Sequence, residues 1–225
     1  MVGCALLLFF VYLHVLSART GLALTYLFLA SYVIYYISGF RGQTILIAIA
    51  IALIALASWL VLPTLQNRIR YNLYDLSHIQ HHTYRSGTSD GNRLISLKAG
   101  CSIIGMHPFG VGAGDVRAAA NAWYSEHVPT MQDSDKIYPS SEWIVYGMMA
   151  GWPGIVLFTL IILYPVFLKE MASRFFWVSL CLLAGLSFVI ETSLEIQYGV
   201  FIYSFVLLWW WKWLTFEKQI TLKHD

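Results

Sequence analysis

The sequence predicts an all-α, polytopic helical membrane protein with about six transmembrane helices and one large extracytoplasmic loop that contains short re-entrant or interfacial helices. Hydrophobic residues make up 58% of the 225 residues and charged residues 12%, whereas a soluble domain carries roughly 25% charged residues. Six apolar stretches come close to the length of about 20 residues that crosses a bilayer as a helix. A long polar segment, residues 63–141, lies between the third and the fourth of them.

The expected spans lie near residues 2–16, 21–38, 44–62, 150–168, 174–190 and 196–214. The first and fifth are short and require a thin bilayer or buried ends. The first stretch has no basic start and no small-x-small cleavage site, so we interpret it as a retained span and not as a signal peptide. Because the chain opens inside this apolar stretch, we expect residues 1–225 to be a single membrane domain that forms the C-terminal part of a longer chain.

The basic residues near the ends of the spans predict the orientation of the chain. They lie between spans two and three, between spans four and five, and at or beyond the end of span six, at Arg41, Lys169, Arg174, Lys212, Lys218 and Lys223. Because short cytoplasmic loops are enriched in lysine and arginine, this side is assigned to the cytoplasm, and residues 63–141 and 191–195 face outward. The net charge of +2 does not indicate a nucleic-acid partner.

The stretch "RLISLKAGCSIIGMHPFGVGAGD", residues 93–115, ends in a series of glycines that could be mistaken for a nucleotide loop. It lacks the strand that precedes a dinucleotide fingerprint and the Gly-Lys-Ser/Thr that ends a phosphate loop. Residues 94–106 are too few to span a bilayer, so we expect a re-entrant or interfacial helix that Arg93 opens and Pro108 stops. Lys98 should point to its polar side. The glycines then permit a close approach of the backbone to another backbone segment or to a ligand.

Arg19 and Arg93 are both predicted at the outer membrane surface. A planar guanidinium grips phosphate oxygens through paired hydrogen bonds, so two such arginines suit a lipid-linked phosphate. The alternatives are that Arg19 snorkels to lipid headgroups and that Arg93 caps its helix or pairs with Asp90.

Several other polar groups have more ordinary interpretations. Three histidines in the polar loop could suggest zinc, but zinc needs three or four closely arranged ligands, so we expect solvated or interfacial histidines and no metal. Two carboxylates should share one helical face at the outer end of span five, where an interfacial location is favoured over an intramembrane ion path. One histidine should pack within the first span. These groups are His78, His81 and His82, Glu191 and Glu195, and His14.

Three blocks in order resemble the core domain of the bacterial O-antigen ligase and O-antigen polymerase family. "SARTG" resembles its Ser-Arg signature, and "GNRLISLKAGCSIIGMHPFGVGAGD" resembles its arginine-headed segment with a His/Asn-Pro-x-x-Gly-x-Gly turn. "SSEWIVYGMMAGWPGIVLF" resembles the third block, usually His-Asn-x-Tyr-Leu followed by Gly-x-x-Gly, with Gly151 and Gly154 at the two glycines. The resemblance extends over about residues 15–170.

This resemblance implies an inverting glycosyltransferase that needs neither a metal nor another cofactor. Its substrate would be an oligosaccharide linked to undecaprenyl diphosphate, and its acceptor a second glycan or the lipid A core. It would act in surface polysaccharide synthesis at the outer face of the bacterial inner membrane, with the large loop in the periplasm. Arg19 and Arg93 would then bind the diphosphate and stabilise it as the leaving group.

One departure from the family concerns the base. The family histidine that opens the third block aligns with Ser140, and a serine cannot take a proton from an acceptor hydroxyl at neutral pH. Glu142 lies two positions on, where partial burial would raise its pKa toward that of a useful base. His127, in the same loop, is the second candidate. The alternative is a non-catalytic relative that binds the lipid-linked glycan or a partner subunit.

Overall fold

The computed structural model describes residues 2–16, 18–37, 41–61, 63, 66–67, 70–71, 86–168 and 175–224, and the side chains of some of them, Arg19 included, are not described. All regular elements in these ranges are helices, so the all-α prediction is confirmed. The chain forms two compact units, residues 1–91 and 92–225.

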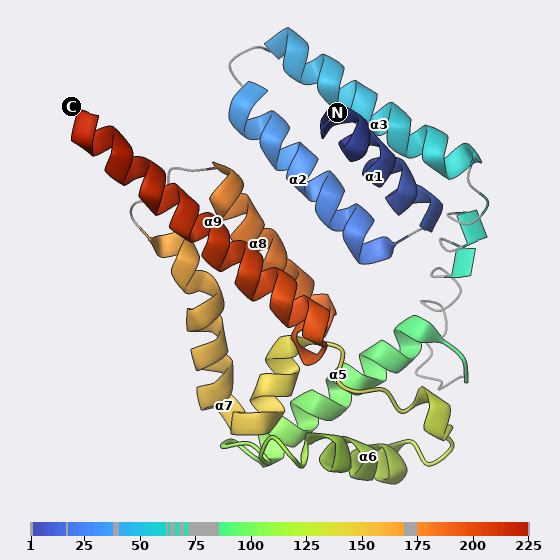
Figure 1. Cartoon of the computed structure of the whole chain (residues 1–225). Coiled ribbons are helices and arrows are strands. Elements are labelled where there is room, and N and C mark those ends of the chain that lie inside the picture. Colours follow the sequence, from blue (N-terminus) through green and yellow to red (C-terminus); the bar gives the residue numbers. More distant parts are fainter. Residues whose placement is uncertain are drawn as a thin grey trace. The chain divides into compact units, whose positions relative to one another are not determined.

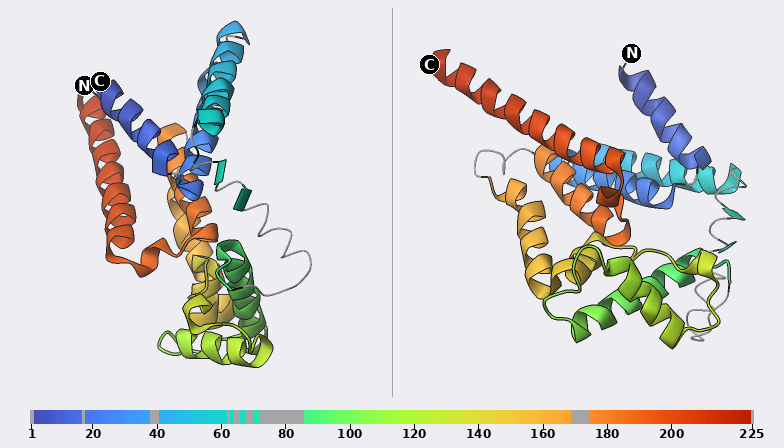
Figure 2. Two further views of the ribbon diagram at one scale, coloured as in Figure 1. Left: turned by 90° about the vertical axis from the view of Figure 1, so that its right-hand side faces the viewer. Right: turned by 60° about the horizontal axis from the view of Figure 1, so that its bottom comes forward.

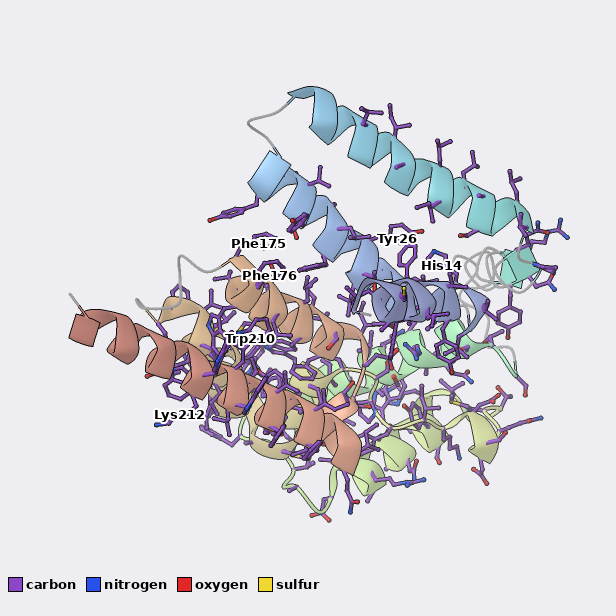
Figure 3. All side chains as sticks on the ribbon, turned by 45° about the horizontal axis from the view of Figure 1, so that its top comes forward. His14, Tyr26, Phe175, Phe176, Trp210 and Lys212 are labelled. Atoms are coloured by element: carbon purple, nitrogen blue, oxygen red, sulfur yellow. The ribbon has the colours of Figure 1, made fainter. Side chains whose placement is uncertain are left out.

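The first unit contains three apolar helices: α1 (Val2–Leu16), α2 (Arg19–Ile37) and α3 (Arg41–Val61). The helix α2 packs against both α1 and α3 (Figure 1). His14 of α1 is buried, and its Nε2 lies 2.7 Å from the hydroxyl of Tyr26 on α2 (both labelled in Figure 3). Its Nδ1 lies 2.7 Å from the carbonyl oxygen of Phe10. His14 is therefore the packed polar residue that the sequence predicts, with a partner for each ring nitrogen.

The second unit contains α5 (Ser89–Met106, which begins at the boundary), α6 (Val116–His127), α7 (Glu142–Leu163), α8 (Phe175–Ile190) and α9 (Gln197–His224). Short 3₁₀ turns lie between them: η1 (Asp133–Asp135), η2 (Tyr164–Phe167) and η3 (Ser193–Glu195). One core cluster joins α8 to α9 through Trp177, Cys181 and Leu207, and Trp210 of α9 packs against it (Figure 3).

The helix α7 is sharply broken at Gly151, which has φ +67° and ψ −152° (Figure 1; also the right-hand view of Figure 2). Pro153 follows two residues later and has no N–H to donate. The break therefore leaves the carbonyl groups of Met148 and Met149 without their usual helical partners. The glycine series after α5 supplies substitutes: the N–H of Val111 donates to Met148 O at 2.8 Å, and that of Gly112 to Met149 O at 3.1 Å.

The close contact of the two segments depends on glycines. A third hydrogen bond runs in the opposite direction, from the N–H of Trp152 to Pro108 O at 2.9 Å. A Cβ added at Gly151 would lie 1.8 Å from that same oxygen, and one added at Gly110 would lie 2.4 Å from Met149 O. The glycine series is thus a structural joint, in which backbone approaches backbone as the sequence predicts.

Gly151→Ala is expected to lower the melting temperature in detergent by at least about 5 °C, because it adds a positive-φ penalty to a backbone clash. Gly114→Ala is the matched control, since Gly114 is exposed and a Cβ there would meet nothing within 4 Å. A thermal unfolding scan of both variants measures the difference. Equal melting temperatures would show that the joint contributes nothing to stability.

The six expected spans each overlap one of the helices α1, α2, α3, α7, α8 and α9. Among the described residues, one helical segment, Glu142–Phe167, is long and apolar enough to cross a membrane. Three other helical segments are apolar but shorter: Cys4–Leu16, Thr20–Tyr35 and Phe175–Ile190. The predicted start of the fourth span, residue 150, falls at the break in α7.

Two local predictions were wrong. The helix α5 begins at Ser89, and Arg93 lies one turn inside it, because the polar start Ser89–Asp90 favours a helix N-terminus and sits well with the helix dipole. Glu191 and Glu195 do not share a helical face, since α8 ends at Ile190 and Glu195 lies in η3. The end of α5 at Met106 and the exposure of Lys98 agree with the prediction.

Candidate functional site

Three segments of the second unit place polar side chains in one neighbourhood. They are the beginning of α5, residues 138–142 before and at the start of α7, and the turn from α8 to α9 through η3. Hydrogen bonds connect them: Arg93 on α5 bonds Glu191 after α8, and Ser140 bonds the first turns of α5. Another hydrogen bond joins Glu142 to Leu194 in η3.

Arg93 forms a two-pronged ion pair with Glu191. Its Nη1 lies 3.1 Å from Oε1 and its Nη2 lies 3.3 Å from Oε2. Nη1 also lies 3.5 Å from the carbonyl oxygen of Ile190, the last residue of α8. Each side chain of the pair is 36% exposed. The guanidinium is thus held at the C-terminal end of α8, where the helix dipole favours a cation, and part of it remains open to solvent.

Ser140 lies directly against the helical turn that carries Arg93. Its hydroxyl is 3.4 Å from the carbonyl oxygen of Arg93 and 3.1 Å from the hydroxyl of Ser96. The Ser96 hydroxyl donates to the same Arg93 carbonyl at 2.7 Å and accepts the N–H of Ser140 at 3.3 Å. These bonds fix the position of residue 140 next to Arg93, although 47 residues separate the two in the chain.

Glu142 is the first residue of α7 and is fully buried, with 0% of its surface exposed. Its Oε1 accepts a 2.5 Å hydrogen bond from the N–H of Leu194, and its Oε2 is buried with no hydrogen-bond partner among the described residues. The sequence predicts partial burial, and the structure encloses this carboxyl group completely. A buried carboxyl oxygen without a partner is costly to keep, and a catalytic role is one of the explanations for such a group.

Tyr138 lies close enough to Glu142 and Glu195 to interact electrostatically with both carboxylates. Burial, and then these two carboxylates, raise the pKa of the Tyr138 phenol to about 12. The phenol therefore stays protonated at neutral pH and cannot serve as a base. This excludes Tyr138 and leaves the neighbouring carboxyl groups, of which Glu142 is the one at the start of α7.

His127 lies at the C-terminal end of α6 and is exposed. Its ring stacks on Trp123 with centroids 4.4 Å apart, and its Nδ1 lies 3.1 Å from the Trp123 carbonyl oxygen. Glu126 Oε2 lies 3.9 Å from the same nitrogen. These are local contacts within one helix, and in the described part of the chain no hydrogen bond or ion pair joins His127 to Arg93, Ser140 or Glu142.

A family model described as O-antigen ligase matches residues 4–159 of the chain. The chain belongs to the O-antigen ligase family. No curated protein and no solved structure matched it. Membership implies an O-antigen ligase-type function in surface polysaccharide synthesis, a lipid-linked glycan as substrate and a membrane context. The apolar segment Glu142–Phe167 is consistent with that context.

The match to the O-antigen ligase family covers all three blocks that suggested the resemblance, from "SARTG" to the third block around α7. The structure does not describe the side chain of Arg19, so its predicted meeting with Arg93 lies outside what the structure describes. The histidines at 78, 81 and 82 also lie outside the described residues. In the described part of the chain, no group of three or more histidine, cysteine, aspartate or glutamate residues could hold a metal ion.

Three contributors to the site were missed from the sequence. Ser96 lies three residues after Arg93 on the buried face of α5, and this helical spacing was the one available signal. The Leu194 N–H is a backbone group, which no sequence pattern identifies. Glu191 was noted only as an interfacial carboxylate, and its bond to Arg93 across 98 residues of chain needs the fold to be known.

Proposed function

We propose that this protein is a multi-pass protein of the bacterial inner membrane that transfers a glycan from undecaprenyl diphosphate to an acceptor glycan or to the lipid A core. The proposal includes six spans in one membrane domain, with residues 63–141 facing the periplasm. Membership of the O-antigen ligase family supports the reaction class. The one-to-one overlap between the six apolar stretches and six helices supports the topology.

The observation that carries the proposal is the contact between Arg93 and residue 140. In the family these positions hold an arginine and a histidine that are expected to act on one substrate, so they must lie together. Here the Ser140 hydroxyl is 3.4 Å from the Arg93 carbonyl oxygen. The Ser96 hydroxyl forms hydrogen bonds with both of these groups. The site geometry is therefore consistent with the family arrangement, although the histidine itself is replaced.

The proposed reaction breaks the bond between the anomeric carbon of the glycan and the diphosphate oxygen. The electron pair of that bond goes to the diphosphate, while the acceptor hydroxyl attacks the opposite face of the sugar and inverts its configuration. Arg93, together with Arg19, binds the diphosphate. Fixed cations aimed at the leaving group lower the barrier, because negative charge grows there during the reaction.

Glu142 is the proposed base that takes the proton of the acceptor hydroxyl, and His127 is the second candidate. Glu142 is buried beneath the turn that contains Leu194, and it accepts a hydrogen bond from the N–H of Leu194. An acceptor can reach it only when η3 moves away, so the proposal requires the turn from α8 to α9 to open during the reaction.

The alternative function is a non-catalytic member of the family that binds the lipid-linked glycan or a partner subunit. Ser140 favours this alternative, because it stands where the family has its histidine. The enclosed position of Glu142 also favours it, since a base must come within hydrogen-bond reach of the proton it removes.

A transfer assay separates the two functions. Membranes that contain the protein, supplied with labelled undecaprenyl diphosphate-linked oligosaccharide and acceptor, should release undecaprenyl diphosphate and form a longer or acceptor-linked glycan. Ser140→His should increase the rate if the site is otherwise assembled. If neither form releases undecaprenyl diphosphate above the level of membranes without the protein, the transferase proposal is wrong and the non-catalytic alternative is favoured.

A further inference from the structure

The guanidinium of Arg93 is already occupied by a carboxylate. Both outer nitrogens bond separate oxygens of Glu191, at 3.1 and 3.3 Å, and the Ile190 carbonyl lies near one of them. This fork-to-fork arrangement is the one that an arginine uses to bind two oxygens of a phosphate group. A carboxylate and a phosphate cannot both take the same pair of N–H groups.

We propose that Glu191 is a positioning residue that occupies the phosphate place on Arg93 until the lipid-linked diphosphate displaces it. The inference rests on the proposed function, because it concerns the same site: Glu191 competes with the diphosphate for the guanidinium of Arg93. Glu191 keeps the guanidinium extended at the end of α8 in the absence of the donor, and its release couples donor binding to the turn between α8 and α9.

The exposure of the pair makes this exchange feasible. Each side chain is 36% exposed, and ion pairs that remain in contact with water are weak enough to be replaced. A diphosphate offers more negative charge and more acceptor oxygens than one carboxylate, so it competes successfully for the same nitrogens.

The position of Glu191 links the exchange to the proposed base. Glu191 directly follows α8, and three residues later the N–H of Leu194 holds the buried carboxyl group of Glu142. When the diphosphate releases Glu191, the ion pair that holds the start of this turn to α5 is lost. Donor binding thereby loosens the turn that closes Glu142 off from the acceptor.

The test measures binding of farnesyl diphosphate to the full chain in nanodiscs, with farnesol as the control for the apolar tail. Glu191→Gln is expected to lower the Kd by about fivefold, because the competing charge is removed from a partly exposed pair. A purely structural role for Glu191 would not tighten binding. Glu195→Gln is the matched control, since it removes an equal charge from the same turn, and among the described residues Arg93 pairs with Glu191 and not with Glu195. Its Kd should stay within about twofold of wild type.

Arg93→Ala distinguishes this inference from the proposed function. Weaker binding by Arg93→Ala, with Glu191→Gln no tighter than Glu195→Gln, overturns the role of Glu191 and leaves the diphosphate site in place. Equal binding by wild type and Arg93→Ala overturns the assignment of Arg93, and the role of Glu191 with it. Tighter binding by Glu191→Gln alone supports the inference.

Discussion

Glu142→Gln is expected to reduce glycan transfer by about 100-fold or more, which is the usual scale for losing a general base. The amide keeps the size of the carboxyl group. Its oxygen can still accept the hydrogen bond that the N–H of Leu194 donates to Oε1 in the wild type. What the variant loses is the ability to take up a proton. The initial rate of transfer from undecaprenyl diphosphate-linked glycan measures the effect directly.

Two further variants make this result interpretable. Glu126→Gln makes the same chemical change at an exposed side chain of α6 and should leave the rate unchanged. His127→Ala removes the second candidate base, whose described contacts are within its own helix and which should therefore matter little. Full activity in Glu142→Gln combined with a large loss in His127→Ala would transfer the role of base to His127.

A purely structural role for Glu142 gives a different pattern. The buried Oε2 without a partner would then only cost stability, and glutamine could relieve the burial of a charge-bearing group. In that case Glu142→Gln would keep its transfer rate and would melt at the same or a higher temperature. The rate and the melting temperature should therefore be measured on the same preparation.

The helices were predictable from the sequence because their signal is local. Apolar runs gave the approximate positions of α1, α2, α3, α8 and α9, and Pro108 gave the end of α5. The glycine series was predicted to permit a close approach of the backbone to another backbone segment or to a ligand, and the structure shows the former. Its partner could not be predicted, because the break at Gly151 and the free carbonyls of Met148 and Met149 become visible only when the two segments meet.

The site was less predictable, since its contacts join residues far apart in the chain. Family resemblance singled out Arg93 and the position of Ser140, and the structure adds that the two lie in contact. The end of α8 at Ile190 was close to the predicted end of the fifth span, but the ion pair with Glu191 was not foreseen, because it depends on how this helix end lies beside α5. The complete burial of Glu142 likewise could not be predicted, because it depends on η3, where Leu194 lies 52 positions later in the chain and bonds its carboxyl group.

Replacing either arginine is expected to remove most of the affinity for the diphosphate. A charge-assisted bond to phosphate contributes about 1.5–3 kcal/mol, so Arg19→Ala and Arg93→Ala should each raise the Kd by at least about tenfold. Lysine should not restore Arg93, because an ammonium group cannot make two parallel bonds to phosphate oxygens. Arg117→Ala, at an exposed position of α6, is the matched control and should bind as wild type does.

The central claim is that Arg19 and Arg93, 74 positions apart by their residue numbers (93 − 19), bind one diphosphate. The most direct test is the affinity for farnesyl diphosphate of wild type, both single alanine variants and the double variant. Two groups that share a ligand are coupled, so the loss in the double variant should differ clearly from the sum of the two single losses, expressed as free energies. Wild-type affinity in either single variant, or losses that simply add, would contradict a shared diphosphate site.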